Sequence, residues 1–278
     1  MVSKIEILQY FYQIYPDKES EYFIYDGKYY YLAKANELKS YYHLYMQALN
    51  LQGFQVVNNC FNQVVSRGYI LFTYQNEQYN LNDFLIQSSL PLSQKIDILK
   101  IKESWCIILD KAKKIIGKYA SRTCHFEHFI VLSYYYQGLG ECAINVLNQL
   151  QAHEISTGIE HFLFEDDYAI LCNPSNFIVA SRIKDLTSAY KKRLITIEQL
   201  EYYINYFNLS NDELKYLYAR ILFCDEFFKI AIKEDCSEAA VKKKLIEIYQ
   251  NIDNERQLIK MAFEILRKYI NIPFISWL

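Results

Sequence analysis

The segment 158–193 constrains the fold most, because it places three short apolar runs and a charged helix start in close succession. Two of these runs, Ile159–Phe164 and Tyr168–Cys172, flank an acidic triplet and are predicted to form the strands of a hairpin. The third run, Phe177–Ala180, follows an Asn-Pro turn and is predicted to be a short strand. A helix is expected to begin near Lys184. The segment therefore predicts strand, turn, strand, short strand and helix.

The beginning of the chain carries a second set of strand signals. Tyr22–Tyr25 and Lys28–Lys34 are predicted strands, and the Asp26-Gly27 pair between them is a strong signal for a two-residue hairpin turn. Two more strands are predicted at 54–60 and 64–74, where apolar and polar residues alternate. These patterns predict a small antiparallel sheet near the N-terminus.

Two helices are predicted within this first part. Residues 1–14 suit a short amphipathic helix that Pro16 would stop. Asn36 is predicted to cap a helix from Glu37 to Leu51, and Gly53 would end it, because helices prefer a left-handed residue after their last turn.

The rest of the chain is predicted to be mostly helical from Leu81 onward. A long segment of helical periodicity covers 93–119, and a second covers 124–150 with a break at Gly138-Leu139-Gly140. Two capping-box pairs are expected farther on, at Thr196 with Gln199 and at Ser210 with Glu213. The order of elements predicts an α+β protein with a β-rich lobe at 1–78, which has one helix between its strands, and a helical lobe at 79–278.

Composition excludes several classes of function. Hydrophobic residues make up 52% of the chain and charged residues 22%, which indicates a globular protein rather than a disordered one. The net charge of −2 argues against binding nucleic acid through phosphate neutralisation.

The cysteines and the apolar stretches bear on location. Seven cysteines without a CxxC pair suit reduced thiols and a cytoplasmic protein. The N-terminal residues do not read as a signal peptide, and no apolar run is long enough to span a membrane.

Two short motifs in the sequence resemble those of a known family. The run 134–144 reads Tyr-Tyr-Tyr-Gln-Gly-Leu-Gly-Glu-Cys-Ala-Ile, and a second match joins Ile159-Glu160-His161, Asn173–Phe177 and Lys184-Asp185-Leu186. Together they resemble the bacterial spore-coat-associated kinase-like proteins of the CotS type. These proteins belong to the aminoglycoside/choline-kinase branch of the protein-kinase-like superfamily. The resemblance implies a two-lobed kinase-like fold, protein partners in the spore coat and deposition on that coat.

The same resemblance implies that the catalytic positions, in the region 158–186, are degenerate. His161 falls where the family's catalytic loop begins, but Leu163 falls where its catalytic Asp belongs. Ala180 falls where the metal-binding Asp would close the short strand. Lys34 matches the strand lysine that would contact ATP phosphates, and Glu37 is too near to it in sequence to be a convincing partner. Phosphoryl transfer depends on positioning and charge neutralisation, so these losses predict an inactive protein without a cofactor.

The remaining polar residues have structural explanations as well as functional ones. Asp185 is predicted to have a structural role by capping a helix, with catalysis as the alternative. Asp166 and Asp167 suit a turn, with cation binding as the alternative. Cys124, His125 and His128 have helical spacing, but a zinc site needs a fourth ligand, and no metal site is predicted.

Three hypotheses follow. The first is a catalytically inactive, kinase-like structural or recruiting protein, acting in spore coat assembly as the resemblance implies. The second is a small-molecule phosphotransferase that binds ATP and Mg²⁺ with relocated acids, chosen from Asp166, Asp167 and Asp185, together with Lys34. The third is a helical interaction domain unrelated to kinases, which the absence of a small antiparallel sheet would favour.

Overall fold

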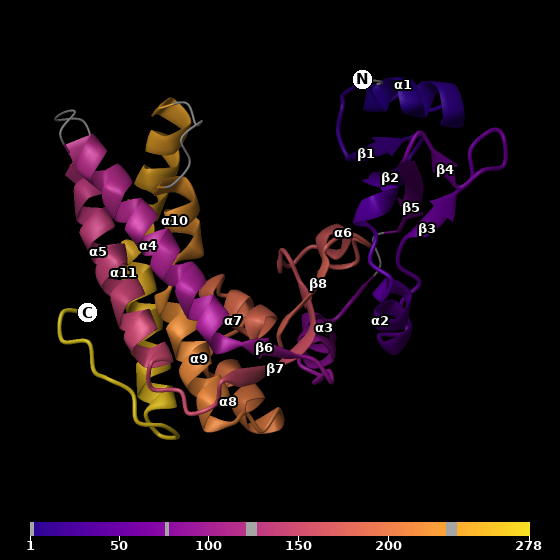
Figure 1. The fold of residues 1–278 in the computed structure, drawn as a ribbon. Helices are drawn as coiled ribbons and strands as arrows, with labels where there is room; N and C mark the ends of the chain where they lie inside the picture. The colour runs from indigo at the N-terminus through magenta and orange to yellow at the C-terminus, as the bar shows by residue number, and fades with distance from the viewer. Residues whose placement is uncertain (1–2, 76–77, 121–126, 232–237) are drawn as a thin grey trace. The chain divides into compact units, whose positions relative to one another are not determined.

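The computed structural model describes residues 3–75, 78–120, 127–231 and 238–278. Contacts within the chain group it into two compact units. The first comprises Met1–Leu92 and Gly158–Asp185, and the second comprises Ser93–Thr157 and Leu186–Leu278. The second half of the chain thus contributes one segment, 158–185, to the first unit (Figure 1). The division at residue 78 that the sequence suggested differs from this grouping and stays a prediction.

A five-stranded antiparallel sheet forms the centre of the first unit. Its strand order is β1-β2-β5-β3, and β4 also pairs with β5. The strands are β1 (Tyr22–Tyr25), β2 (Lys28–Lys34), β3 (Gln55–Val57), β4 (Val65–Ser66) and β5 (Tyr69–Tyr74). The predicted hairpin is confirmed, since Tyr25 pairs with Lys28, and Asp26 and Gly27 both have positive φ, as a tight primed turn requires.

One face of this sheet packs against the N-terminal helices. These are α1 (Lys4–Ile7) and the π-helical turn η1 (Leu8–Tyr12), and Ser3 begins α1 with a capping box. Leu8 and Ile14 form a buried cluster with Leu32 and Leu71 from the sheet. The opposite face carries Tyr22, Tyr31, Phe54, Phe72 and Tyr74, whose rings contact one another.

The helix predicted at 37–51 is shorter in the structure and begins at a later residue. Residues Ala35–Glu37 form a 3₁₀ turn, η2, and α2 begins only at Tyr42 and ends at Ala48. Asn36 lies inside the turn and caps nothing. Asn50, with φ of 55°, follows the end of α2 in the left-handed conformation. Gly53 also has a positive φ, but it lies beyond that point, where the Tyr42 hydroxyl is packed against it.

The segment 154–185 departs from its predicted strand-strand hairpin. It contains β7 (Glu154–His161), α6 (Tyr168–Leu171) and β8 (Phe177–Ser181). The predicted strand 168–172 is therefore wrong, because the Asp167 side chain accepts from the backbone N–H groups of Ala169 and Ile170 and starts a helical turn. β8 lies next to β7, and β6 (Lys95–Asp97) pairs with the first half of β7.

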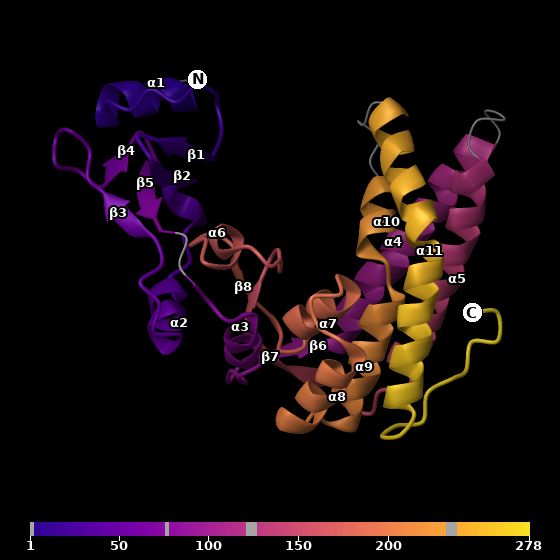
Figure 2. The same cartoon turned by 180° about the vertical axis from the view of Figure 1, so that it is seen from behind.

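The second unit is a bundle of long and short helices. α5 packs against α4 and α9, and α11 lies along α5, α9 and α10 (Figure 1 and Figure 2). The capping boxes at Thr196 and Ser210 are confirmed. The helices of the chain not yet given bounds are α3 (Leu81–Ser88), α4 (Ile98–Ala120), α5 (Glu127–Leu147), α7 (Lys184–Lys191), α8 (Ile197–Tyr206), α9 (Asn211–Leu222), α10 (Asp225–Ala231) and α11 (Glu238–Leu266).

The predicted break at Gly138-Leu139-Gly140 is wrong, because α5 continues through it. An added Cβ on Gly140 would lie 2.6 Å from Leu109 Cδ2, so this glycine permits close approach of α4 to α5. The α+β fold class is confirmed, with a small antiparallel sheet and a larger helical region. Within the described residues, none of the helices combines the length and apolar character that crossing a membrane requires.

Candidate functional site

His161 and Asp185 form a buried pair at the end of β7. His161 Nδ1 lies 2.6 Å from Asp185 Oδ2, and the backbone N–H of His161 donates to both carboxylate oxygens, at 3.1 and 3.2 Å. Both side chains are fully buried. The rings of Tyr45, Phe164 and Phe177 surround the imidazole, with centroids 4.9–5.5 Å away. The carboxylate thus fixes the orientation of the imidazole in an aromatic enclosure.

Asp185 has a structural role of a different kind from the predicted cap. It lies in the first turn of α7, but its carboxylate is directed to His161 rather than to the exposed amides of its own helix. Lys184 supplies a positive charge, with its Nζ 3.7 Å from Asp185 Oδ1, and also donates to the backbone oxygen of His161. The carboxylate is therefore paired and hydrogen-bonded, which a buried charge requires.

Glu160 adds a second buried carboxyl next to the pair. Its Oε2 accepts from the backbone N–H of Asp185 at 2.7 Å, and its Oε1 is buried without a hydrogen-bond partner. Burial, reinforced by the negative charge of Asp185, raises the pKa of the Glu160 carboxyl well above its ordinary value of 4.5. The raised pKa favours the neutral form of the Glu160 carboxyl.

We expect the Glu160→Gln variant to lose part of the pH dependence of folding stability. The folded state holds the Glu160 proton more tightly than the unfolded state does, so this stabilisation is complete below about pH 4.5 and is lost as the pH rises. Between about pH 5 and about pH 8, the urea midpoint of the parent protein should fall more than that of Glu160→Gln. The exposed Glu141→Gln is the control. Equal slopes for the parent and Glu160→Gln would contradict this assignment.

A buried polar side chain, Asn176, holds the backbone at Leu163. The Asn176 side chain accepts from the N–H of Leu163 at 2.8 Å and donates to the carbonyls of Leu163 and Ile170. Leu163 is 47% exposed, and its neighbour Phe162 is 63% exposed. Ala180 lies near the end of β8. Neither Leu163 nor Ala180 carries a group that can bind a metal or move a proton.

Two acids that follow Leu163 in the sequence, Asp166 and Asp167, make structural contacts. Asp167 caps α6, as described above, and Asp166 Oδ1 accepts from the Tyr79 hydroxyl at 2.8 Å. Neither lies in the hairpin turn that the sequence suggested, because residues 168–171 are helical. These contacts explain both acids without a metal ion.

Lys34 has an acidic partner that the sequence comparison with kinases had set aside. Its Nζ lies 3.1 Å from Glu37 Oε1, and both side chains are about half exposed. This hydrogen bond raises the pKa of the Lys34 ammonium. The 3₁₀ turn at 35–37 brings the two side chains together. The sequence had predicted a helix beginning at Glu37 and had not predicted this contact.

Tyrosine hydroxyls connect the sheet to the segment that follows α6. The Tyr22 hydroxyl donates to the carbonyl of Ala169 and accepts from Asn173, and the Tyr31 hydroxyl lies 2.7 Å from Ser175 Oγ. Tyr22 and Tyr31 are stacked on each other, with centroids 4.6 Å apart. The sequence did not identify these residues, and the only signal was the abundance of tyrosine in β1 and β2.

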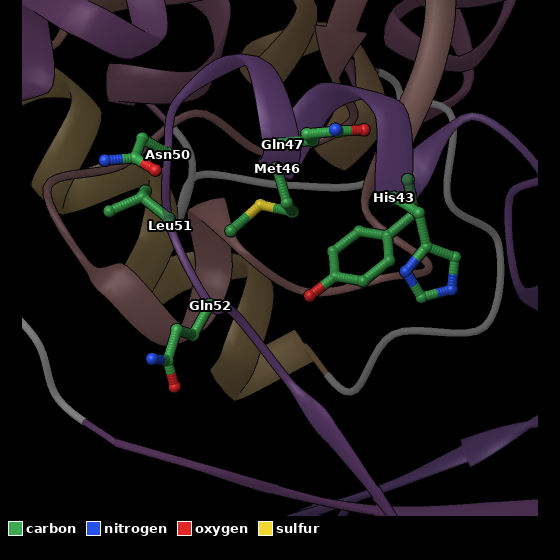
Figure 3. A pocket seen from close by; sticks show the side chains of 7 residues that line it. His43, Met46, Gln47, Asn50, Leu51 and Gln52 are labelled. Carbon is green, nitrogen blue, oxygen red and sulfur yellow. The ribbon is translucent and has the colours of Figure 1, made fainter.

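A pocket of about 290 Å³ lies at the C-terminal end of α2 (Figure 3). Figure 3 shows the Met46 side chain at its centre, with amide side chains around the rim. It contains none of the residues predicted for a site. The lining residues are Tyr42, His43, Met46, Gln47, Asn50, Leu51 and Gln52.

A metal centre is not found among the described residues, where no three His, Cys, Asp or Glu side chains gather to hold an ion. Of the three residues considered for a zinc site, Cys124, His125 and His128, the first two lie outside the described residues. Leu163 and Ala180, which the sequence resemblance places at the two carboxylate positions, have side chains that offer no ligand to Mg²⁺–ATP.

The combination of elements defines the class of fold. A small antiparallel sheet is followed by a larger helical region, and a histidine at the end of a strand pairs with an Asp at the start of a helix. The comparison with solved structures shows that the chain shares its fold with an aminoglycoside phosphotransferase. The small antiparallel sheet is present in the first unit, so the feature that would have favoured the third hypothesis, its absence, is not observed.

The particular match is the crystal structure of an aminoglycoside phosphotransferase from Alicyclobacillus acidocaldarius subsp. acidocaldarius. The TM-score is 0.57, and the match covers 91% of this chain and 92% of that chain. Sequence identity is 13%, so the likeness concerns the fold. No model of a known protein family matches the sequence, and no curated protein matches it either.

Proposed function

We propose that this protein is a catalytically inactive kinase-like protein with a structural or recruiting role. The observation that carries the proposal is the pair of apolar residues, Leu163 and Ala180, at the positions where a kinase-like enzyme has its two carboxylates. Removing electrostatic stabilisation of this kind costs about 3 kcal/mol or more in transition-state free energy for each group. The loss of both would leave little phosphotransfer.

The contacts of the neighbouring acids support the same conclusion. Asp166 accepts from Tyr79, Asp167 caps α6, and Asp185 is buried against His161. Recruiting any of the three to a metal would break a hydrogen bond that now stabilises the fold. The tyrosine hydroxyls of β1 and β2 bond to the segment 169–175, so the sheet face that carries them is engaged by protein groups.

The place of action is proposed from the resemblance in sequence alone. The run 134–144 and the matches at 159–161, 173–177 and 184–186 support a component of the spore coat. Its partners would then be other coat proteins, and its location would be the cytoplasm of the developing cell followed by the coat. A fluorescent fusion in the source bacterium tests this. We expect the signal only in cells that form spores, and equal signal in growing cells would contradict it.

One observation favours the second hypothesis, a small-molecule phosphotransferase. Lys34 is paired with Glu37, and a strand lysine paired with a glutamate is the arrangement that positions ATP phosphates in kinases. The matched fold belongs to a phosphotransferase as well. This reading still requires a carboxylate to hold Mg²⁺, and the acids named for it are occupied by other contacts.

We expect Mg²⁺–ATP to leave the melting temperature of the protein unchanged. A nucleotide present at about a hundred times its Kd would stabilise the folded state by about 2.7 kcal/mol, which a thermal shift assay detects easily. An active aminoglycoside phosphotransferase serves as the positive control. A Mg²⁺-dependent rise in melting temperature, lost in Lys34→Ala, would favour the second hypothesis instead.

A further inference from the structure

We propose that an exposed aromatic patch on the first unit is a self-association surface that binds the same patch on a second copy of this chain. The patch consists of Tyr10 and Phe11 from η1 and of Cys60 and Phe61 from the loop after β3. We call these four residues the aromatic patch. This inference goes beyond the proposed function and does not depend on it.

Contacts between two distant segments build the aromatic patch. The ring of Phe61 lies 6.2 Å from that of Tyr10 and 6.1 Å from that of Phe11, and the N–H of Cys60 donates to the carbonyl of Phe11. Tyr10 is nevertheless 68% exposed and Phe61 is 56% exposed. Large aromatic side chains that cluster and stay exposed are typical of binding surfaces.

The loop that carries Phe61 is held by a buried side chain. Asn59 Oδ1 accepts from the N–H groups of Phe61 and Gln63, both at 2.9 Å, and Asn59 Nδ2 donates to Ser66 Oγ at 2.9 Å. Asn59 itself is buried. A loop fixed in this way loses little conformational entropy on binding, which favours association.

Charge is absent from both segments that form the aromatic patch. No Asp, Glu, Lys or Arg occurs in 7–16 or in 40–66, although charged residues make up 22% of the chain. Soluble proteins normally intersperse charges on such surfaces to prevent association. An uncharged patch does not attract a phosphate, a nucleic acid or a charged membrane surface, so its partner is a protein surface that is itself uncharged.

A second copy of this chain meets that requirement. In an isologous contact, residues near the two-fold axis face their own counterparts, so a charge there would repel itself, whereas aromatic rings pack together. Carboxamides are also self-complementary, because each has both donors and an acceptor. Exposed carboxamides lie within a few residues of the aromatic patch in the sequence, at Gln9, Gln13, Asn58, Asn62 and Gln63.

The test measures the mass of the full chain by light scattering and sedimentation velocity over a range of concentrations. We expect the parent protein to reach twice its monomer mass of 33.2 kDa as concentration rises. Phe61→Lys and Phe61→Glu should each stay monomeric, because like charges would face each other across the axis. An equimolar mixture of the two variants should again form dimers, because opposite charges then meet.

Tyr134→Lys is the matched control, since Tyr134 is an exposed aromatic residue on α5, in the other unit. It should dimerise like the parent, and circular dichroism should show that all variants are folded. A parent protein that stays monomeric at every concentration would overturn the proposal. So would dimers that survive Phe61→Lys, or variants that fail to associate when mixed.

Discussion

Replacing Asp185 with alanine should lower the free energy of unfolding by about 3–5 kcal/mol, the usual cost of breaking a buried ion pair by removing one partner. The substitution would leave the N–H and Nδ1 of His161 without the carboxylate they contact, and it would remove a carboxylate that lies 3.7 Å from Lys184 Nζ. All of these groups lie where water has little access. Urea unfolding of the parent and the variant, followed by circular dichroism, measures the difference.

Two matched variants show whether the charge or the hydrogen bonds matter more. Asp185→Asn keeps one acceptor oxygen and should lose less stability than Asp185→Ala. Glu264→Ala removes an exposed carboxylate from a surface ion pair and should change stability by less than about 1 kcal/mol. If Asp185→Ala proves as mild as Glu264→Ala, the buried pair does not stabilise the fold as described.

Gly158→Ala should be the second large effect, at about 3 kcal/mol or more, because it inserts a methyl group into space that backbone already fills. An ideal Cβ on Gly158 would lie 2.0 Å from the carbonyl oxygen of Ser88 and 3.2 Å from Glu160 Oε1. The carbonyl belongs to the end of α3, so relieving the clash would move a helix or a strand. Urea unfolding again gives the free energy.

Gly138→Ala provides the comparison within the same chain. Its Cβ would lie 3.2 Å from the ring of Trp277, a side chain that can shift, and alanine favours a helix over glycine by about 1 kcal/mol. We expect a stability within about 1 kcal/mol of the parent. If both variants lose a similar free energy of unfolding, the close approach of Gly158 to the Ser88 carbonyl does not limit stability as described.

Elements specified by local chemistry were predicted well from the sequence. The β1–β2 hairpin follows from Asp26-Gly27, because that pair adopts the positive φ values of the turn. The capping boxes at Thr196 and Ser210 depend on side chains three residues apart, so a short stretch of sequence contains all their information.

Elements decided by competing local signals or by packing were predicted wrongly. The run 168–172 is apolar and short, so its periodicity fits a strand or a helix, and the Asp167 cap decides for α6. The glycines of α5 suggested a break, but Leu109 packs against Gly140 and the helix continues. Tertiary contacts of this kind are not visible in a local pattern.

The candidate site was predicted by position but not by geometry. The resemblance placed His161, Leu163, Ala180 and Asp185 in one region, and segment 158–185 does form part of one unit. The sequence did not show that Asp185 binds His161, since 24 residues separate them. The sequence interpretation also set Glu37 aside as too near to Lys34 in sequence to be its partner, whereas the two side chains form an ion pair across the 3₁₀ turn.

The central claim is that the kinase-like fold is present without the acids that grip a metal–triphosphate. Isothermal titration calorimetry of ATP into the protein, with and without Mg²⁺, tests it most directly, and Lys34→Ala is the matched variant. We predict no saturable heat of binding under either condition. Saturable binding that requires Mg²⁺, disappears in Lys34→Ala and is accompanied by phosphate transfer to an acceptor would contradict the account.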